Sequence, residues 1–369
     1  MVTYNTSASI EFINDGYVAP LTSLAPAIGT KRGFFDGGVH YCDGSICSLG
    51  LQIKGSYDNQ PQPLDRLEVR QNLEGSFVFG GLLQNEHFGH FMAESLTRLW
   101  AAQHLAKADC IVFYLRERSR PVAQFVNETL ALLLPRNSYR IITEPTKIKF
   151  LAVPGQLGDL NQGFIYGHPL VREMVGNLCT NPINGPKKLY VARSRLGGRE
   201  GGIVLEAAIQ DNLIKEGYTI LHPQEHSIES QLQLYGSAEK LIFAEGSAVH
   251  LYALVANIHQ DSFIIWRRKK HGTFDWQLQS FGAKKTFGIP SVSELWVPVS
   301  EPSVTVRGRA ILDFDSLCLQ LTRHGFIGGT KWSSPSHDRL KAEFDGVRQK
   351  MNIDFVRYPN ELIGENLAL

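Results

Sequence analysis

The stretch Leu241-Ile-Phe-Ala-Glu-Gly-Ser-Ala-Val-His250 shows the pattern that decides the fold. Four apolar residues end at Glu245-Gly246, and small residues then lead into a second apolar segment. A short, continuous apolar run predicts a strand that is covered on both faces. Ser247 is a typical helix N-cap residue, so we expect a strand, a tight turn and a helix in that order.

The same alternation extends on both sides through the second half of the chain. Strands are predicted at 188–192, 218–221, 241–244, 262–266 and 285–289, and helices at 205–216, 228–235, 249–256 and 274–281. Apolar strands separated by helices predict a parallel sheet with helices on both faces.

The first half follows this pattern less regularly. Strands are predicted at 77–83, 110–115, 140–143 and 148–153, and helices at 122–134 and 170–178. The turn-rich stretch 181–186 is the clearest break in the chain. We therefore expect an α/β protein with two Rossmann-like domains, at 76–182 and 187–300.

The two ends of the chain are expected to be additions to these domains. Residues 1–75 hold many Gly, Pro and Asp residues between short apolar pieces, which predicts an irregular β-rich segment. Residues 301–369, with predicted helices at 310–323 and 336–351, are expected to form a C-terminal helical extension that braces the N-terminal domain.

Bulk properties exclude several classes of protein. A length of 369 residues favours two domains, and 37 basic against 36 acidic residues argue against a nucleic-acid-binding protein with a strong positive field. The five cysteines show no disulfide or zinc spacing, which indicates a reducing compartment. Neither a signal peptide nor an apolar run of about 20 residues is visible, so we expect a cytoplasmic protein with at most peripheral membrane contact.

Ionisable groups gather in Asn85-Glu-His-Phe-Gly-His-Phe-Met-Ala-Glu-Ser-Leu-Thr-Arg-Leu-Trp100. In a helix that begins near His87, the side chains of His90, Glu94 and Arg98 drift by only ~40° per step and share one face. A neighbouring imidazole and carboxylate can act as a general acid/base pair, and either could take a proton from a hydroxyl. The alternative is an ordinary surface helix with an ion pair between Glu94 and Arg98.

A glycine-rich turn follows the strand predicted at 188–192. In an open α/β sheet, ligands bind beyond the carboxyl ends of the strands. This turn carries Arg193, Arg195 and Arg199 among glycines, which suits a diphosphate because Arg binds phosphate with two hydrogen bonds. A mobile basic surface loop is the alternative interpretation.

The turn after the strand at 241–244 is the second candidate. Free N–H groups at a helix start favour an anion, and Gly246, Ser247 and Ala248 allow close approach. Glu245 could accept hydrogen bonds from ribose or sugar hydroxyls, and His250 would lie within reach of a phosphate. The alternative is a tight turn whose small residues serve packing.

Two further motifs are weaker. Asp313-Phe-Asp315 has the form that can hold Mg²⁺ or Mn²⁺ on a nucleotide sugar, although two exposed acids beside a helix or strand are far commoner. The basic run Arg267–His271 could meet phosphates or an anionic surface, but a charge run is usually a solvated face.

Together these blocks resemble glycosyltransferase family 61, which includes bacterial capsule and lipopolysaccharide enzymes. Asn85–Leu99 is similar to the first family block, Lys188–Arg195 with Arg199 and Glu206 to the second, and Glu245–His250 to the third. The resemblance covers roughly residues 80 to 270. It implies a GT-B-like arrangement, in which two Rossmann-like domains face a cleft.

The resemblance also implies inverting transfer from a nucleotide sugar, usually a UDP-sugar, to a glycan hydroxyl in bacterial polysaccharide biosynthesis. It makes Glu94 or His90 the base, and it places Asn85, His87 and Arg98 in support on the acceptor side. The donor would be held by Arg193, Arg195, Arg199, Glu245, Gly246, Ser247, Ala248 and His250.

The expected partners are therefore a nucleotide-sugar donor and a glycan acceptor, with possible peripheral association at the inner face of a membrane and no nucleic acid. No metal or other cofactor is expected, since guanidinium and helix N–H groups supply the positive charge. Two alternatives remain: an inactive sugar-nucleotide or glycan-binding protein, and a nucleotide-sugar epimerase.

Overall fold

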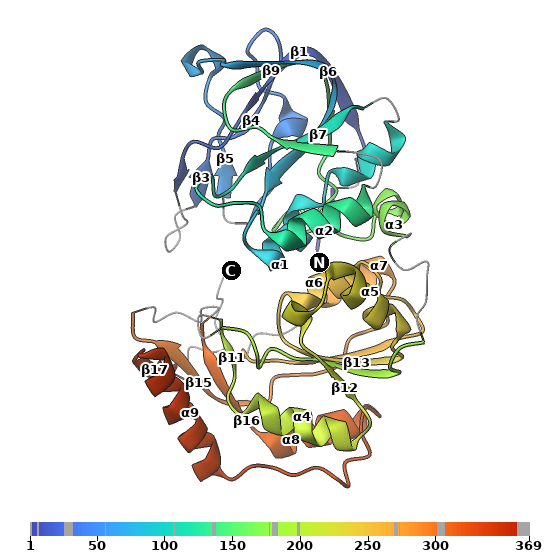
Figure 1. The fold of residues 1–369 in the computed structure, drawn as a ribbon, viewed down its shortest axis with the longest axis vertical. Coiled ribbons are helices and arrows are strands. Elements are labelled where there is room, and N and C mark those ends of the chain that lie inside the picture. The colour runs from blue at the N-terminus through green and yellow to red at the C-terminus, as the bar shows by residue number, and fades with distance from the viewer. Residues whose placement is uncertain are drawn as a thin grey trace. The chain divides into compact units, whose positions relative to one another are not determined.

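The computed structural model describes residues 2–5, 7–25, 32–55, 57–105, 108–134, 138–176, 178, 184–197, 200–268, 272, 274–300 and 307–359. The protein is a mixed α/β protein (Figure 1). It divides into two compact units, Met1–Thr180 and Asn181–Ala368, close to the turn-rich stretch 181–186.

The first unit is built on a six-stranded sheet with the order β4-β1-β9-β6-β7-β8. Strands β9, β6, β7 and β8 run parallel, whereas β1 is antiparallel to both β4 and β9. The strands are β1 (Ile10–Ala19), β4 (Gly38–His40), β6 (Gln71–Leu83), β7 (Cys110–Leu115), β8 (Ser138–Ile141) and β9 (Thr146–Pro154). A separate small sheet contains β2 (Leu24–Ala25), β3 (Gly33–Phe35) and β5 (Tyr57–Asn59).

The N-terminal residues are part of this unit, which differs from the separate segment expected for 1–75. Strand β1 pairs with β9 from Ile10 opposite Pro154 to Val18 opposite Thr146. Ile13 and Val18 of β1 lie in the same buried cluster as Phe77 and Val112. The physical reason is that β1 covers what would otherwise be an open, aggregation-prone edge of β9.

The helical segments of the first unit are short. They are α1 (Phe88–His90), η3 (Phe91–Ser95), η4 (Leu99–His104), α2 (Gln124–Leu133) and α3 (Pro169–Val175), together with the single turns η1 (Ser48–Gly50) and η2 (Leu64–Arg66). Segment η3 is a single π-helical turn, and η4 is a 3₁₀ helix.

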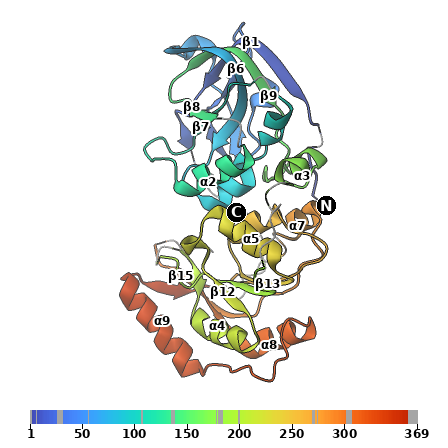
Figure 2. The same ribbon diagram turned by 45° about the vertical axis from the view of Figure 1, so that its right-hand side comes forward.

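The second unit contains a four-stranded parallel sheet with the order β12-β10-β13-β14. Its elements are β10 (Lys188–Val191), α4 (Glu206–Lys215), β12 (Thr219–Leu221), η5 (Pro223–Glu225), α5 (Ile228–Ser237), β13 (Lys240–Ala244), α6 (Ala248–Ala253), β14 (Asp261–Ile265) and α7 (Asp275–Phe281). Figures 1 and 2 show α5, α6 and α7 on one face of this sheet and α4 on the other. The chain leaves β10 toward β12 and returns to β13 on the opposite side, so a topological switch point lies between β10 and β13.

A second sheet of this unit has the order β11-β16-β15-β17. It contains β11 (Gly202–Ile203), β15 (Val292–Pro298), β16 (Arg309–Leu312) and β17 (Phe355–Arg357), and it is accompanied by α8 (Phe314–Arg323) and α9 (His337–Met351). The helix predicted at 310–323 therefore begins as a strand. The strand predicted at 285–289 is reduced to a bridge between Phe263 and Phe287, beside Gly288 with its φ of 105°.

The C-terminal region contributes to the core of the second unit, and the bracing of the N-terminal domain by 301–369 stays a prediction. Phe314, Phe344 and Phe355 lie in the same buried cluster as Tyr190 and Ile242 of the second unit's parallel sheet. Their large apolar side chains gain more by completing this core than a surface extension could provide. Residues 301–306 and 360–369 lie outside the described residues.

Two sequence predictions concern membrane-spanning segments and the state of the cysteines. In the described parts of the chain, we find no helix with the length and apolar character needed to cross a membrane. Cys42, Cys47, Cys110 and Cys318 are free thiols, and Cys179 lies outside the described residues.

Candidate active site

The candidate acid/base pair lies directly after β6, where the chain enters α1. The ring of His87 caps this turn by accepting a hydrogen bond from the backbone N–H of His90 at 3.4 Å. The chain then makes the π-helical turn of η3 instead of continuing as an α-helix. Such single turns are often found at functional sites. A π-helical turn changes the angle between successive side chains. His90 and Glu94 therefore still share one face, as expected, but Arg98 does not lie on it.

Glu94 is a buried carboxylate, only 2% exposed, with three hydrogen-bond donors around it. Its Oε1 atom lies 2.5 Å from Nδ1 of His90, and its Oε2 accepts from Nζ of Lys54 at 2.6 Å and from Nε2 of Gln84 at 2.7 Å. Burial by itself raises the pKa of Glu94, but the hydrogen bonds and charges of His90 and Lys54 outweigh it and lower this pKa to about 2. The carboxylate is therefore ionised at neutral pH and is a weak base.

The imidazole of His90 is the accessible member of the pair, with 37% of its side chain exposed. Its bond to Glu94 orients the ring so that Nε2 lies on the far side from the carboxylate. The ring of His87 lies 4.4 Å from that of His90, measured between centroids. Burial is the largest cause that lowers the pKa of His87 to about 4, and the charge of Arg116 adds to it, so His87 is neutral at pH 7.

Three polar residues at this site were missed in the sequence: Lys54, Gln84 and Arg116. Gln84 joins two of the groups, because its Oε1 also accepts from Nη1 of Arg116 at 3.2 Å. Gln84 and Arg116 directly follow β6 and β7, whose carboxyl ends are adjacent in the sheet, so the rule used for the second half could have found them. Lys54 lies in a segment without a regular pattern, and nothing in the sequence indicated its role.

Arg98 has a structural position rather than one beside the acceptor. The guanidinium is buried, and it donates to the backbone oxygens of Leu49 at 2.6 Å, of Leu51 at 2.6 Å and of Pro154. Burial lowers the pKa of Arg98 to about 10. Arg98 therefore fastens this segment to β9 and to the loop at 49–51, and the ion pair with Glu94 that its spacing allowed is replaced by these bonds.

Asn85 is also structural. Its Nδ2 donates to the backbone oxygens of Glu117 at 3.1 Å and Arg120 at 3.0 Å, and its Oδ1 accepts from the N–H of Glu117 at 3.2 Å. The amide thus holds the loop that follows β7. It supports the site indirectly, by fixing the loop next to Arg116.

In the second unit, the fold brings Arg193 and Gly246 into contact. Arg193 follows β10 and Gly246 follows β13, and these two parallel strands flank the switch point. A Cβ atom on Gly246 would lie only 2.2 Å from Nη1 of Arg193, so any larger residue at this position would displace the guanidinium. Two candidates that are 53 positions apart in the numbering therefore form one site, where a ligand of an α/β sheet is expected.

Among the described residues, the guanidinium of Arg193 has two weak contacts, and the buried carboxylate of Glu206 holds its backbone. Its side chain is 12% exposed, and Nη2 donates to the backbone oxygen of Gly201 at 3.2 Å and lies 4.0 Å from Glu200. Glu206 at the start of α4 accepts from the backbone N–H of Arg193 at 2.8 Å and from the hydroxyl of Tyr190 at 2.9 Å. Burial lowers the pKa of Arg193 and raises that of Glu206.

A cavity of about 210 Å³ lies beside Arg193. Its lining includes the glycine-rich loop, the start of α4 and two C-terminal elements, and it consists of Arg193, Ser194, Leu196, Glu200, Gly201, Gly202, Ile203, Val204, Leu205, Glu206, Ala207, Arg309, Glu343 and Val347. Arg309 on β16 and Glu343 on α9 come from the region that was expected to brace the other domain. They therefore belong to the surroundings of the candidate donor site.

The other two arginines of the loop do not join this site. Arg195 forms an exposed ion pair with Glu225 at 3.0 Å. Arg199 lies outside the described residues.

Glu245 does not match its expected role as an acceptor for sugar hydroxyls. It is completely buried, and its Oε2 accepts from the backbone N–H groups of Arg267 at 3.0 Å and Arg268 at 3.2 Å. Its Oε1 accepts from Nε of Arg268 at 2.5 Å. These bonds already occupy both oxygens. They also give Arg267 and Arg268 of the basic run a structural function, while 269–271 lie outside the described residues.

The helix after Glu245 is also less suited to an anion than expected. Helix α6 is only six residues long, and Ser247 makes no side-chain capping bond. His250 is buried, with Nδ1 2.7 Å from Oε1 of Gln277 and its ring edge-on to Phe274. Gly246, Ser247 and Ala248 are partly exposed, so close approach of a ligand remains possible at these small residues alone.

The Asp313-Phe-Asp315 motif has a local explanation. Oδ1 of Asp313 accepts from the backbone N–H groups of Asp315 at 3.1 Å and Ser316 at 2.9 Å, which caps the start of α8. Within the described ranges, no group of three or more His, Cys, Asp or Glu side chains is arranged to hold a metal ion.

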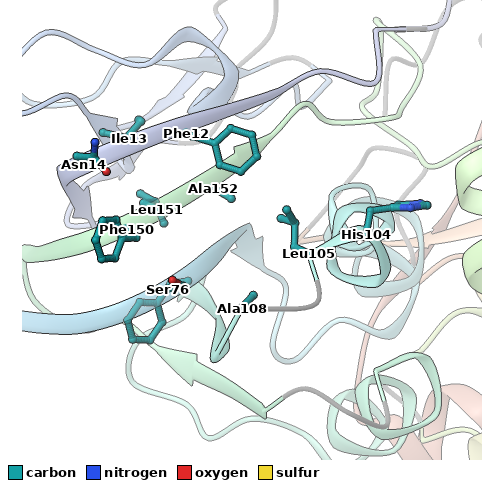
Figure 3. Close-up of a pocket in the computed structure, with 11 residues that line it drawn as sticks. Phe12, Ile13, Asn14, Ser76, His104, Leu105, Ala108, Phe150, Leu151 and Ala152 are labelled. Atoms are coloured by element: carbon teal, nitrogen blue, oxygen red, sulfur yellow. The ribbon is translucent and has the colours of Figure 1, made fainter.

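A cavity of about 430 Å³ in the first unit has a different character (Figure 3). It lies on one face of the sheet and is bordered by apolar residues of β1 and β9, including Phe12 and Phe150, which are 73% and 48% exposed. Figure 3 shows the ring of His104 directed away from these two phenylalanines. None of the described candidate residues lines it, so we place the candidate site at the polar clusters.

Comparisons with known proteins agree with the motifs. The Glycosyltransferase 61 family model matches residues 88–257, slightly less than half of the chain. No curated protein matches the chain. A solved structure of the dodecameric iron-containing heptosyltransferase TibC in complex with ADP-D-beta-D-heptose is 10% identical and covers 95% of this chain and 99% of that chain, but its TM-score of 0.27 is too low to support an argument. The segment that contains His90, Glu94, Arg193 and Gly246 is therefore similar to glycosyltransferase family 61.

Proposed function

We propose that the protein is a glycosyltransferase that moves a sugar from a nucleotide sugar to a hydroxyl group of a glycan acceptor. The family match over residues 88–257 supports this reaction class. The observation that carries the proposal is the 2.5 Å contact between His90 and a buried, ionised Glu94. This is the arrangement that a general base of this kind requires.

In this proposal His90 is the base and Glu94 orients it. Glu94 is poorly suited to take the proton itself, because both of its oxygens already accept hydrogen bonds from His90, Lys54 and Gln84. Nε2 of His90 instead accepts the proton of the acceptor hydroxyl, and Glu94 stabilises the resulting imidazolium. The acceptor oxygen forms a bond to the anomeric carbon as the bond to the nucleoside diphosphate breaks, with inversion at that carbon.

For the donor, we propose that the guanidinium of Arg193 binds the diphosphate beside Gly246. Its place at the switch point of the parallel sheet supports this assignment, as does the bidentate fit of guanidinium to phosphate. The positive charge of Arg193 would stabilise the leaving group, so that no divalent metal is needed. A UDP-sugar donor and a role in bacterial polysaccharide biosynthesis are proposed from the motif resemblance alone.

The test begins with a thermal-shift screen against nucleotide sugars, because a bound ligand raises the melting temperature. Release of nucleoside diphosphate is then measured with candidate glycan acceptors. We expect His90→Ala to lower transfer by roughly 10²–10⁴-fold while nucleotide binding is retained. His104→Ala, which changes a partly exposed histidine of the same unit, is the matched control and should behave as wild type.

Three outcomes would contradict the proposal. Full activity of His90→Ala would show that His90 is not the base. Tight binding of a nucleotide sugar without transfer to any acceptor would favour an inactive binding protein. Release of an altered sugar without an acceptor would favour an epimerase.

A further inference from the structure

Lys54 lies at the candidate base although it belongs to neither the matched family segment nor the motifs found in the sequence. Its side chain is 7% exposed, and its Nζ lies 2.6 Å from Oε2 of Glu94. The ring of Tyr57 is 5.7 Å from the same nitrogen. A buried ammonium group is costly unless it is paired, so this contact needs an explanation.

The groups around Glu94 come from four segments. His87 and His90 belong to the same segment as Glu94, Gln84 follows β6, Arg116 follows β7, and Lys54 comes from the N-terminal part of the chain. Gln84 is neutral, and Arg116 bonds to Gln84 instead of Glu94. Lys54 is therefore the cation that bonds to the carboxylate on the oxygen opposite the one held by His90.

We propose that Lys54 is a positioning residue that sets the pH range in which the His90–Glu94 pair can accept a proton from the substrate. This inference rests on the proposed function of His90 as the base. Through its bond to Oε2, Lys54 keeps Glu94 ionised and holds the other oxygen, Oε1, next to His90. At the same time, its positive charge opposes uptake of a proton by the pair, so that the pair stays unprotonated to lower pH.

The sign of the effect follows from the charges. Without Lys54, the pair loses a neighbouring positive charge and takes up its first proton more easily, whether the proton rests on the imidazole or on the carboxylate. A pair that is already protonated cannot act as the base. The acidic limb of the kcat/KM profile should therefore move to higher pH in Lys54→Met, by on the order of one pH unit.

The experiment compares the pH dependence of kcat/KM in Lys54→Met, Lys54→Arg and wild type. Lys54→Arg keeps the charge, so its acidic limb should stay near that of wild type even if its rate is lower. Lys149→Met is the matched control, because Lys149 is a half-exposed lysine of the same unit that pairs with Asp15, and its profile should not move. A purely structural role predicts a lower rate at every pH with an unmoved limb, and that result would overturn the proposal.

A second measurement separates this proposal from the proposed function. Titration of the His90 imidazole by NMR, with the signal assigned through His90→Gln, needs no substrate. If the wild type transfers no sugar but the His90 midpoint rises in Lys54→Met and not in Lys54→Arg, then the function is wrong and the electrostatic role of Lys54 stands. An unchanged midpoint in both variants would reject the role of Lys54 whatever the activity.

Discussion

Replacing Gly246 by alanine is the sharpest test of the candidate donor site. The added Cβ would lie 2.2 Å from Nη1 of Arg193 and 3.1 Å from its Cδ and Cζ atoms. Since carbon atoms pack at about 3.5–4.0 Å, the guanidinium must withdraw by roughly 1 Å or more. Gly246 does not have a left-handed backbone conformation, so alanine itself is tolerated there and the effect comes from this contact.

The expected loss is one well-placed interaction with the diphosphate. Hydrogen bonds to charged groups contribute about 1.5–3 kcal/mol, and their geometry tolerates less than the required displacement. The affinity for nucleotide should therefore fall by roughly 10-fold to 100-fold. The folded state should change less, because Arg193 keeps only a 3.2 Å bond to Gly201 and a 4.0 Å ion pair.

The assay is isothermal titration calorimetry with UDP, together with the melting temperature of the free protein. Gly197→Ala is the matched control, since it lies in the same glycine-rich loop and a Cβ there meets no atom of the described residues within 4 Å. Wild-type affinity in Gly246→Ala, combined with weak binding in Arg193→Ala, would show that the contact between these residues is unimportant. Wild-type affinity in both variants would place the nucleotide elsewhere.

Three further predictions concern the first unit. Glu94→Gln should lower kcat by about 100-fold with nucleotide binding intact, because an amide cannot stabilise an imidazolium as a carboxylate does; a change below threefold would reject the role of Glu94. Arg98→Met should lower the free energy of unfolding in urea by about 3 kcal/mol, since three backbone oxygens lose a buried partner, whereas Arg66→Met on the surface should change it little. Acid should weaken the fold through Glu94: its folded pKa of about 2 lies below its ordinary 4.5, so the stability it contributes above pH 4.5 is lost as the pH falls towards 2. Urea unfolding of wild type and Glu94→Gln at pH 7 and pH 3 checks this, because the difference between their free energies of unfolding should be smaller at pH 3.

The second unit was the more predictable part of the fold. Most of its strands and helices lie within a few residues of the predicted ranges, because continuous apolar strands and turn residues are strong local signals. The helix predicted at 310–323 was wrong at its start, where pairing of Arg309–Leu312 with β15 overrides the local pattern. Tertiary pairing commonly decides such short apolar segments.

The candidate sites were likewise predictable from the sequence only in part. Arg193 and Gly246 could be found because each directly follows an apolar strand, and the rule for parallel sheets places strand ends together. Glu245 could not be assigned correctly, since its ionic partner Arg268 lies 23 residues away in a run that looks solvent-exposed. The π-helical turn after His90 also has no distinct sequence pattern, and it separates Arg98 from the other two side chains.

The sequence by itself determined the α/β class and the break near 181–186, and it indicated a pairing of His90 with Glu94 beside the alternative of Glu94 with Arg98, because these depend on periodicity and on neighbours within one turn of helix. Only the tertiary structure decided that β1 joins the first sheet, that Phe314 and Phe344 complete the second core, and that Lys54 reaches Glu94 from 40 residues away. The reason is physical. A buried charge is stabilised by whichever partner the fold brings within hydrogen-bonding distance, and separation along the chain does not reveal that distance.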